Sequence, residues 1–214
     1  MSKLQRVRGI RAGGIVAVLL VLLVVGCTLL PEPRETYYYA IEYELPADVP
    51  QGRSAGVVRV LEPSVAPAYD RRQIVLRGDS ARYQYLTDDL WGVEPRASLQ
   101  MLLERYHEEA GTYSAVLGEF DRGVADHEIH SAIRRIEYVD GDTPHTRVEL
   151  VFEARSTGDS SRTIARYHVD YDEPTSGTGG LERFAYDVNR VFLEAIYEFD
   201  SEIRGGIDDD RAGQ

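Results

Sequence analysis

Cysteine is almost absent from this chain, because Cys27 is the only one among 214 residues. A single thiol cannot form a disulfide within the chain, so the fold must be stabilised by its hydrophobic core alone. Nucleophile motifs give no support for catalysis either. The one Gly-x-Ser-x-Gly segment, at residues 52–56, precedes a predicted strand, whereas a nucleophile elbow joins a strand to a helix, and there is no second cysteine. We therefore expect no catalytic residues and no enzymatic activity.

Positive charge is also scarce. The chain has 24 lysine and arginine residues against 36 aspartate and glutamate residues, which gives a formal net charge of −12. Such a surface is repelled by nucleic acid and by anionic lipid headgroups. The composition therefore argues against nucleic-acid binding and against a general role in coating membranes.

The chain has only a short apolar run near its beginning, at residues 15–25. A helix of that length spans roughly 16 Å, about half of a bilayer core. Four basic residues and no acidic residue precede the run, and Gly26 ends it. A basic segment, a short apolar segment and a small residue are typical of an export signal. The alternative is an uncleaved N-terminal helix with an incidental cysteine, for which the run is short.

The segment Val24-Val25-Gly26-Cys27 resembles the lipobox of bacterial lipoproteins. The resemblance implies a diacylglyceryl thioether on Cys27, cleavage between Gly26 and Cys27, and acylation of the new N-terminus with a fatty acid such as palmitate. Two or three acyl chains hold a protein stably at a membrane, whereas one does not. Thr28 stands where aspartate commonly retains lipoproteins at the inner membrane, which favours the outer membrane. Cleavage removes four basic residues and changes the net charge from −12 to −16.

The rest of the chain is predicted to form one domain. We expect a signal peptide at residues 1–26, a lipidated tether at 27–35, a domain at 36–204 and a disordered acidic tail at 205–214. Roughly 170 residues are enough for a single hydrophobic core.

Residue patterns predict strands and one helix in the first half of this domain. A period of two or a short apolar run predicts strands, and the predicted strands cover residues 36–45, 57–63, 73–78, 81–87 and 113–118. A helix is predicted for 95–110, with Pro95 in its first turn and Gly111 at its end. Its apolar stripe consists of Leu99, Leu102, Leu103, Tyr106 and Ala110.

The second half combines a strand pair with a long helix. Alternation predicts strands at 146–155 and 161–171, joined as a hairpin. Residues 125–139 are ambiguous. Ile129, Ile133 and Ile136 are spaced as in a helix, whereas Ile136 and Tyr138 alternate as in a strand. A long apolar stripe predicts a helix over 181–204 that ends at Gly205-Gly206. The fold class is therefore α+β, a mixed or antiparallel sheet with two main helices packed on one face.

Two motifs invite a cofactor interpretation. His127 and His130 lie in the segment Asp-His-Glu-Ile-His, but a zinc-protease motif needs histidines four residues apart on a helix. On a strand the two side chains point to opposite faces, so we predict no metal site. The glycine-rich segment before the last helix lacks the lysine of a phosphate-binding loop. We predict no cofactor.

Residues 36–110 resemble the ABC-type transport auxiliary lipoproteins, the PqiC-like family. The resemblance rests on the Tyr-Tyr-Tyr-Ala-Ile segment, on the strand, proline and Gln-Ile-Val-x-Arg pattern of 57–91, and on the helix that follows. The matching residues of the second stretch are Pro63, Tyr69, Arg72, Gln73, Ile74, Val75, Arg77, Tyr83, Tyr85 and Trp91. The shared order of elements favours a strand at 125–139.

The resemblance implies a function and partners. Members of the family are non-enzymatic, lipid-anchored subunits that accompany MCE-type lipid transporters in the bacterial cell envelope, facing the periplasm. The implied partners are an MCE-domain protein and an ABC permease and ATPase complex, with copies of the lipoprotein arranged in a ring. We expect the partner interface to involve Tyr38, Tyr69, Arg72, Arg77 and Trp91. The alternative for 69–77 is a structural turn followed by a core strand.

Two other functions stay open from the residues alone. One is an envelope lipoprotein that assists lipopolysaccharide export or the assembly of an outer-membrane β-barrel. The other is a lipid-tethered hydrolase, which is disfavoured because no nucleophile and base pair is visible in the sequence. The protein that crosslinks to the domain would distinguish the first of these from a transport subunit.

Overall fold

The computed structural model describes residues 34–42, 55–78, 81–158, 162–175 and 179–212. Contacts divide the chain into residues 1–35 and residues 36–214, and the second unit is the one described below. Cys27, the cleavage site and most of the tether lie outside the described residues. Within the described ranges, no helix is long and apolar enough to span a membrane.

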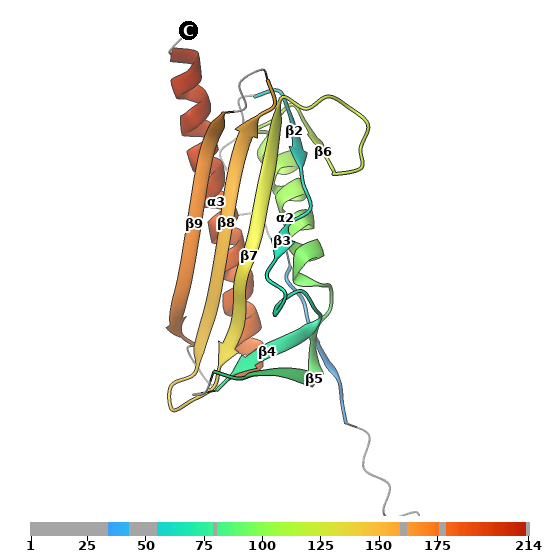
Figure 1. Cartoon of the computed structure of the whole chain (residues 1–214), viewed down its shortest axis with the longest axis vertical. Coiled ribbons are helices and arrows are strands. Elements are labelled where there is room, and N and C mark those ends of the chain that lie inside the picture. The colour runs from blue at the N-terminus through green and yellow to red at the C-terminus, as the bar shows by residue number, and fades with distance from the viewer. Residues whose placement is uncertain (1–33, 43–54, 79–80, 159–161, 176–178, 213–214) are drawn as a thin grey trace, which may run out of the picture. The chain divides into compact units, whose positions relative to one another are not determined.

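Three long strands form an antiparallel meander on one side of the sheet (Figure 1). They are β7 (His127–Val139), β8 (His145–Ser156) and β9 (Thr163–Pro174). β8 pairs with β7 on one side and with β9 on the other. The predicted hairpin of β8 and β9 is confirmed, and the ambiguous segment is a strand.

The other edge of β7 pairs with three short parallel strands in succession. β2 (Val57–Val60), β3 (Ser64–Val65) and β4 (Gln73–Arg77) lie along it in chain order. Each strand is too short to cover the 13 residues of β7, so the chain returns to the same edge three times. The sheet is therefore mixed, and β3 was not anticipated from the sequence.

The remaining strands extend this side of the sheet. β5 (Tyr83–Trp91) forms the predicted hairpin with β4, and β1 (Tyr37–Tyr39) pairs with β5 in parallel. β6 (Ala115–Leu117) pairs with β2. β1 covers only Tyr37–Tyr39 of the predicted strand 36–45, because residues 40–42 are not in a strand and residues 43–45 lie outside the described part. Tyr37 is also 54% exposed.

Both helices cover one face of the sheet (Figure 1). α2 (Pro95–Ala110) begins with Pro95 and ends at Gly111, which adopts the left-handed conformation at φ 62°. Glycine tolerates that conformation because it has no Cβ. α3 (Leu181–Ala212) packs its apolar stripe against β8 and β9. The predicted α+β architecture is confirmed.

A β-bulge explains the ambiguous spacing of the isoleucines in β7. The register shifts between Ile133 and Arg135, so Arg134 is an extra residue in the strand. An extra residue delays the alternation of side chains between the two faces by one position. Two inward residues on either side of the bulge are then three positions apart. Ile129, Ile133 and Ile136 are therefore all buried beneath the helices, although their spacing of four and three is typical of a helix.

The last helix is longer than the sequence predicts. We expected an end at Gly205-Gly206 and a disordered tail from 205, but α3 continues to Ala212. The two glycines differ in their surroundings. A Cβ on Gly206 would clash with the carbonyl oxygen of Ile164 in β9 and lie 3.0 Å from its Cγ2, whereas a Cβ on Gly205 meets nothing within 4 Å. Gly206 therefore allows the helix to approach the sheet.

Alanine substitutions at the two glycines should have opposite effects. Gly206→Ala forces the helix away from Ile164 and should lower the free energy of unfolding by about 1–2 kcal/mol. Gly205→Ala removes only backbone freedom and should raise it by about 0.5–1 kcal/mol. Urea denaturation of both variants measures this difference. Equal effects of the two substitutions would contradict the close approach at Gly206.

Candidate partner-docking surfaces

Two of the residues predicted for the interface are buried in the core. Trp91 is 2% exposed, and its ring centroid lies 5.8 Å from that of Phe184 on α3. Tyr69 is 5% exposed and packs edge-on against Tyr83, with centroids 6.1 Å apart. Neither side chain is available to a partner, so both assignments are corrected. The alternative of a structural turn holds for Tyr69.

Tyr69 contributes instead to a buried carboxylate cluster. Its hydroxyl donates a hydrogen bond to Glu137 Oε2 at 2.9 Å, and Glu137 is 1% exposed. Arg77 Nη1 lies 3.6 Å from Oε2, and Arg147 Nη1 lies 3.7 Å from Oε1 of the same carboxylate. Burial raises the pKa of Tyr69, and its hydrogen bonds to Tyr83 and Glu137 add to the effect. Arg77 therefore compensates an internal charge, although about a third of its side chain is exposed.

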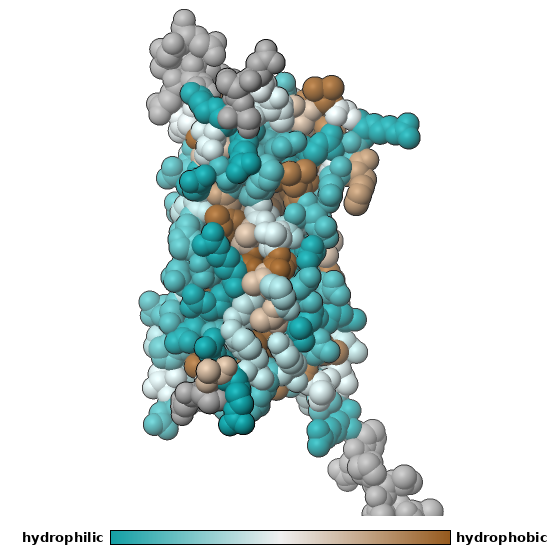
Figure 2. All heavy atoms as spheres, viewed as in Figure 1, coloured by the Kyte–Doolittle hydropathy of each residue, from teal (hydrophilic) through white to brown (hydrophobic). Residues whose placement is uncertain are grey.

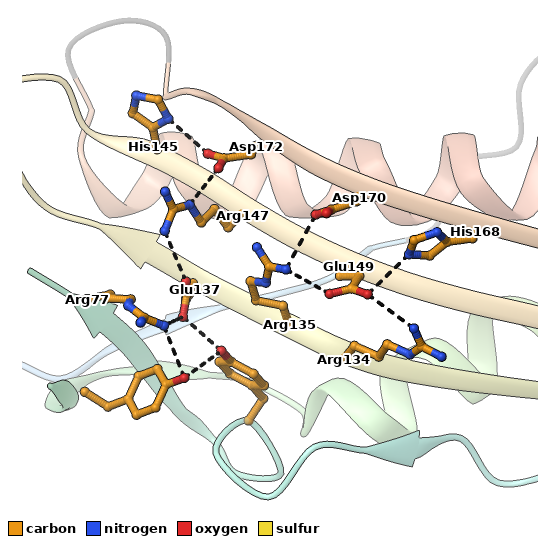
Figure 3. Close-up of polar contacts among 12 residues, drawn as sticks. Arg77, Arg134, Arg135, Glu137, His145, Arg147, Glu149, His168, Asp170 and Asp172 are labelled. Atoms are coloured by element: carbon orange, nitrogen blue, oxygen red, sulfur yellow. Dashed lines mark hydrogen bonds and ion pairs between the residues drawn. The ribbon is translucent and has the colours of Figure 1, made fainter. Parts of the chain in front are cut away.

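The sheet face opposite the helices carries a network of alternating charges (Figure 3). Asp172 of β9 accepts a hydrogen bond from Arg147 Nε at 2.9 Å and contacts His145 Nδ1 at 3.0 Å. The bulge places Arg134 and Arg135 beside Glu149, at 3.4 and 2.9 Å. Figure 2, viewed as in Figure 1 with the long strands in front of the helices, shows hydrophilic residues over β8 and β9. This charged sheet face, which comprises the outward side chains of β7, β8 and β9, is a surface that a partner could contact.

Glu153 on this face should contribute to stability in acid. Hydrogen bonds from Arg155, Thr163 and Arg166 lower the pKa of Glu153 to about 2. A lowered pKa in the folded state stabilises the protein above the unfolded value, near 4.5, and this contribution is lost as the pH falls towards 2. Glu153→Gln should therefore flatten the decrease in unfolding free energy between pH 4.5 and 2. Denaturant melts across this range measure it, and an unchanged slope would contradict the shift.

A groove between β1 and α3 gathers exposed aromatic side chains. It has a volume of about 360 Å³, and Tyr38 and Tyr186 on its walls are 61% and 55% exposed. The guanidinium of Arg72 lies 5.5 Å from the ring centre of Tyr38, and that of Arg183 lies 4.4 Å from the ring centre of Tyr186. The side-chain oxygen of Asn189, on the groove wall, is buried and has no hydrogen-bond partner among the described residues.

The geometry of this aromatic groove suits the side chains of a protein partner. Arg72 Nε and Nη2 donate to the backbone oxygens of Trp91 and Gly92, each at 3.0 Å. Its guanidinium is thus held in place beside Tyr38 before any partner arrives. Tyrosine and arginine are enriched at the centres of protein interfaces. Two residues of the predicted interface, Tyr38 and Arg72, therefore lie together on an exposed surface.

A third surface, the loop 118–126 between β6 and β7, was not anticipated from the sequence. Phe120 and Val124 in it are 93% and 89% exposed. Arg59 of β2 holds the loop: its guanidinium donates to the backbone oxygens of Gly118, Glu119, Asp121 and Gly123, at 2.8 to 3.3 Å. The loop is therefore ordered while it presents two apolar side chains to solvent. The sequence signal was weak, two isolated apolar residues in an acidic loop.

The two histidines of β7 occupy different environments. The ring of His127 lies 5.6 Å from that of Tyr113, and burial lowers the pKa of His127. His130 Nε2 lies 3.5 Å from Glu128 Oε2. Within the described ranges, no group of three or more histidine, cysteine, aspartate or glutamate residues is arranged to hold a metal ion.

Comparisons with known proteins place the chain in a family. The model of the ABC-type transport auxiliary lipoprotein component matches residues 39–185. No curated protein matches the chain. Among solved structures, protein XCC0632 from Xanthomonas campestris, of family model DUF330, is 20% identical with a TM-score of 0.65, and the match covers 81% of this chain and 99% of that one.

Two further solved structures extend the comparison. An uncharacterized protein is 10% identical with a TM-score of 0.59, and the match covers 79% of this chain and 99% of that one. A PelC dodecamer from Paraburkholderia phytofirmans is 12% identical with a TM-score of 0.44, covering 72% and 91%. The matches to XCC0632 and to the uncharacterized protein show that the fold is shared. The family match, which spans most of the domain, shows that this chain belongs to the family of ABC-type transport auxiliary lipoprotein components.

Proposed function

We propose that this chain is a lipid-anchored, non-enzymatic subunit that docks an MCE-type ABC transport system at a membrane of the bacterial envelope, where the system moves lipids. The family match carries the transport role. The lipobox-like segment supports an anchor at Cys27, with the domain facing the periplasm and the outer membrane favoured. The implied partners are an MCE-domain protein and the permease and ATPase complex.

Docking is the part of this function that the surfaces support. The aromatic groove and the loop 118–126 both present exposed aromatic side chains. In the groove Arg72 is held beside Tyr38, and in the loop Arg59 holds the backbone that carries Phe120. An adaptor needs such preformed contacts because ordering flexible side chains on binding costs free energy. We assign the groove, with Tyr38 and Arg72, as the primary contact with the transporter.

Photo-crosslinking in cells tests the partner. Lys3 is the only lysine of the chain, so amine-reactive reagents have no lysine target in residues 27–214. A photoreactive amino acid at Tyr38 or Phe120 should capture an MCE-domain protein or its permease. The same photoreactive amino acid in place of Glu108, on the exposed side of α2, serves as the control. Capture of an outer-membrane β-barrel from Tyr38, with no MCE-domain protein, would replace the transport proposal with an envelope-assembly role.

The anchor has its own test. Cys27→Ser should leave an unlipidated or uncleaved precursor, because the thioether cannot form. Fractionation of cells and mass spectrometry of the N-terminal peptide measure both consequences. A Cys27→Ser protein that is cleaved and fractionates with the outer membrane as the unmodified sequence does would contradict the anchor.

A further inference from the structure

Strand β9 forms one edge of the sheet and is long for an unprotected edge. Within the described part of the chain, β9 pairs with β8 and with no other strand (Figure 1). Soluble proteins protect such edges with lysine, proline, bulges or covering helices. Here the protection lies at the two ends, where α3 approaches Ile164 through Gly206 and where Pro174 ends the strand. The backbone between them is open to another strand.

The hydrogen-bond pattern identifies which residues face this edge. The N–H of Thr175 donates to the carbonyl oxygen of Pro144 at 2.7 Å, in the same register as the pairs of β8 and β9 that precede it. Backbone groups alternate between the two sides of an antiparallel strand. The odd-numbered residues of β9 therefore bond to β8. The residues that direct N–H and C=O to the open edge are Arg166, His168, Asp170 and Asp172.

We propose that the β9 edges of two copies of this chain pair in antiparallel fashion about Val169, forming one continuous sheet. This register places Arg166 opposite Asp172 of the second copy, and His168 opposite its Asp170. The two-fold symmetry repeats each of these pairs, which gives four pairs in all. Every pair joins residues whose backbone groups face the edge, so each pair can form both ladder hydrogen bonds. The contact is isologous, with the same surface used by both copies.

Charge complementarity selects this register over its neighbours. Because edge-facing residues must meet edge-facing residues, the symmetric alternatives are centred on residue 168 or 170. The first places His168 opposite itself and leaves Asp172 opposite the apolar Ile164. The second places the carboxylate of Asp170 opposite itself. Like charges directly opposite each other destabilise a strand pair. The register about Val169 creates no like-charge pair.

The charges within each copy support the same register. Arg166 lies opposite Glu153 of β8, and Asp172 lies opposite Arg147. Pairing about Val169 continues this row as Glu153, Arg166, then Asp172 and Arg147 of the second copy, with alternating sign. The side chains of Arg166 and Asp172 are 65% and 42% exposed despite their internal ion pairs. Each can therefore contact a second partner across the edge.

Disulfide crosslinking of the full chain in membranes reads the register directly. In the proposed pair Val169 faces itself at a position without ladder hydrogen bonds, where Cβ atoms are about 4.5–5.5 Å apart and a disulfide can close after small adjustments. Val169→Cys should give a disulfide-linked dimer at least about five times more abundant than His168→Cys or Asp170→Cys. The sequence without any of these changes, which retains Cys27, is the background control. Equal or greater crosslinking at 168 or 170, or none at 169, would overturn the proposal.

Two charge-reversal variants, tested alone and then mixed, also test the contact. Because the mixed dimer should restore association, a loss in either variant alone is not explained by misfolding. Arg166→Asp and Asp172→Arg each place like charges opposite each other in two pairs, so each variant alone should self-associate about tenfold more weakly. A mixed dimer of the two variants restores every pair. Co-expression with different tags should therefore recover mixed dimers at close to the unmodified level. Failure of the mixed pair to associate, or full self-association of either variant, would overturn the inference.

Discussion

Replacing Phe199 with alanine will lower the free energy of unfolding by about 3–5 kcal/mol. Phe199 is fully buried on α3, and its ring stacks on Phe152 of β8 with centroids 5.2 Å apart. The substitution removes this aromatic contact and leaves a cavity between the long helix and the sheet. Urea or thermal denaturation followed by circular dichroism measures the loss.

Met101→Ala is the matched control for this prediction. Met101 lies on α2 and is 51% exposed, so its truncation should change the unfolding free energy by no more than about 0.5 kcal/mol. A loss below 1 kcal/mol for Phe199→Ala would mean that α3 does not pack on β8 as described.

Replacing Asp200 with alanine will cause a loss of similar size, about 3–5 kcal/mol. Asp200 is 1% exposed and joins α3 to the end of α2. Its carboxylate accepts hydrogen bonds from the Thr112 hydroxyl at 2.6 Å and from Arg204 Nε at 2.7 Å, and it lies 3.5 Å from His107 Nδ1. Alanine leaves these groups without their charged partner. Denaturant melts again measure the effect.

The pH dependence separates the charge of Asp200 from its packing. Burial alone raises the pKa of Asp200, but the contacts with His107, Thr112 and Arg204 outweigh it and hold the pKa below its ordinary value. This contribution is present above the unfolded pKa, near 4, and is lost as the pH falls through the lower folded value. Asp200→Asn should therefore lose less stability in acid than the unmodified chain. Glu202→Ala, on the exposed side of the same helix, should leave the pH profile unchanged.

Local patterns predicted most of the elements. The stripe of α2, the alternation of β8 and β9, and the caps Pro95 and Gly111 depend only on near neighbours, and the structure confirms them. The α+β class followed from their order. In contrast, the isoleucines of β7 left their segment ambiguous, because a bulge changes the spacing of inward residues and the sequence carries no mark of it.

The predicted interface illustrates a second limit. Tyr38 and Arg72 are exposed beside one groove, whereas Tyr69 and Trp91 are buried. Large aromatic residues serve cores and interfaces equally well, because both environments remove their surface from water. A single sequence cannot distinguish the two uses. The apolar tip of the loop 118–126 escaped notice for a related reason, since its order depends on Arg59, about 60 residues earlier in the chain.

The sequence by itself determined the family, the class of fold and the expectation of a lipid anchor, because these depend on short segments and on the order of elements. Only the tertiary structure decided that α3 continues past Gly206, because the use of that glycine depends on the backbone of Ile164, about 40 residues away. It also decided which edge of the sheet stays open and which charges line it. Those features arise from contacts between distant segments, and a local pattern contains no information about which segments will meet.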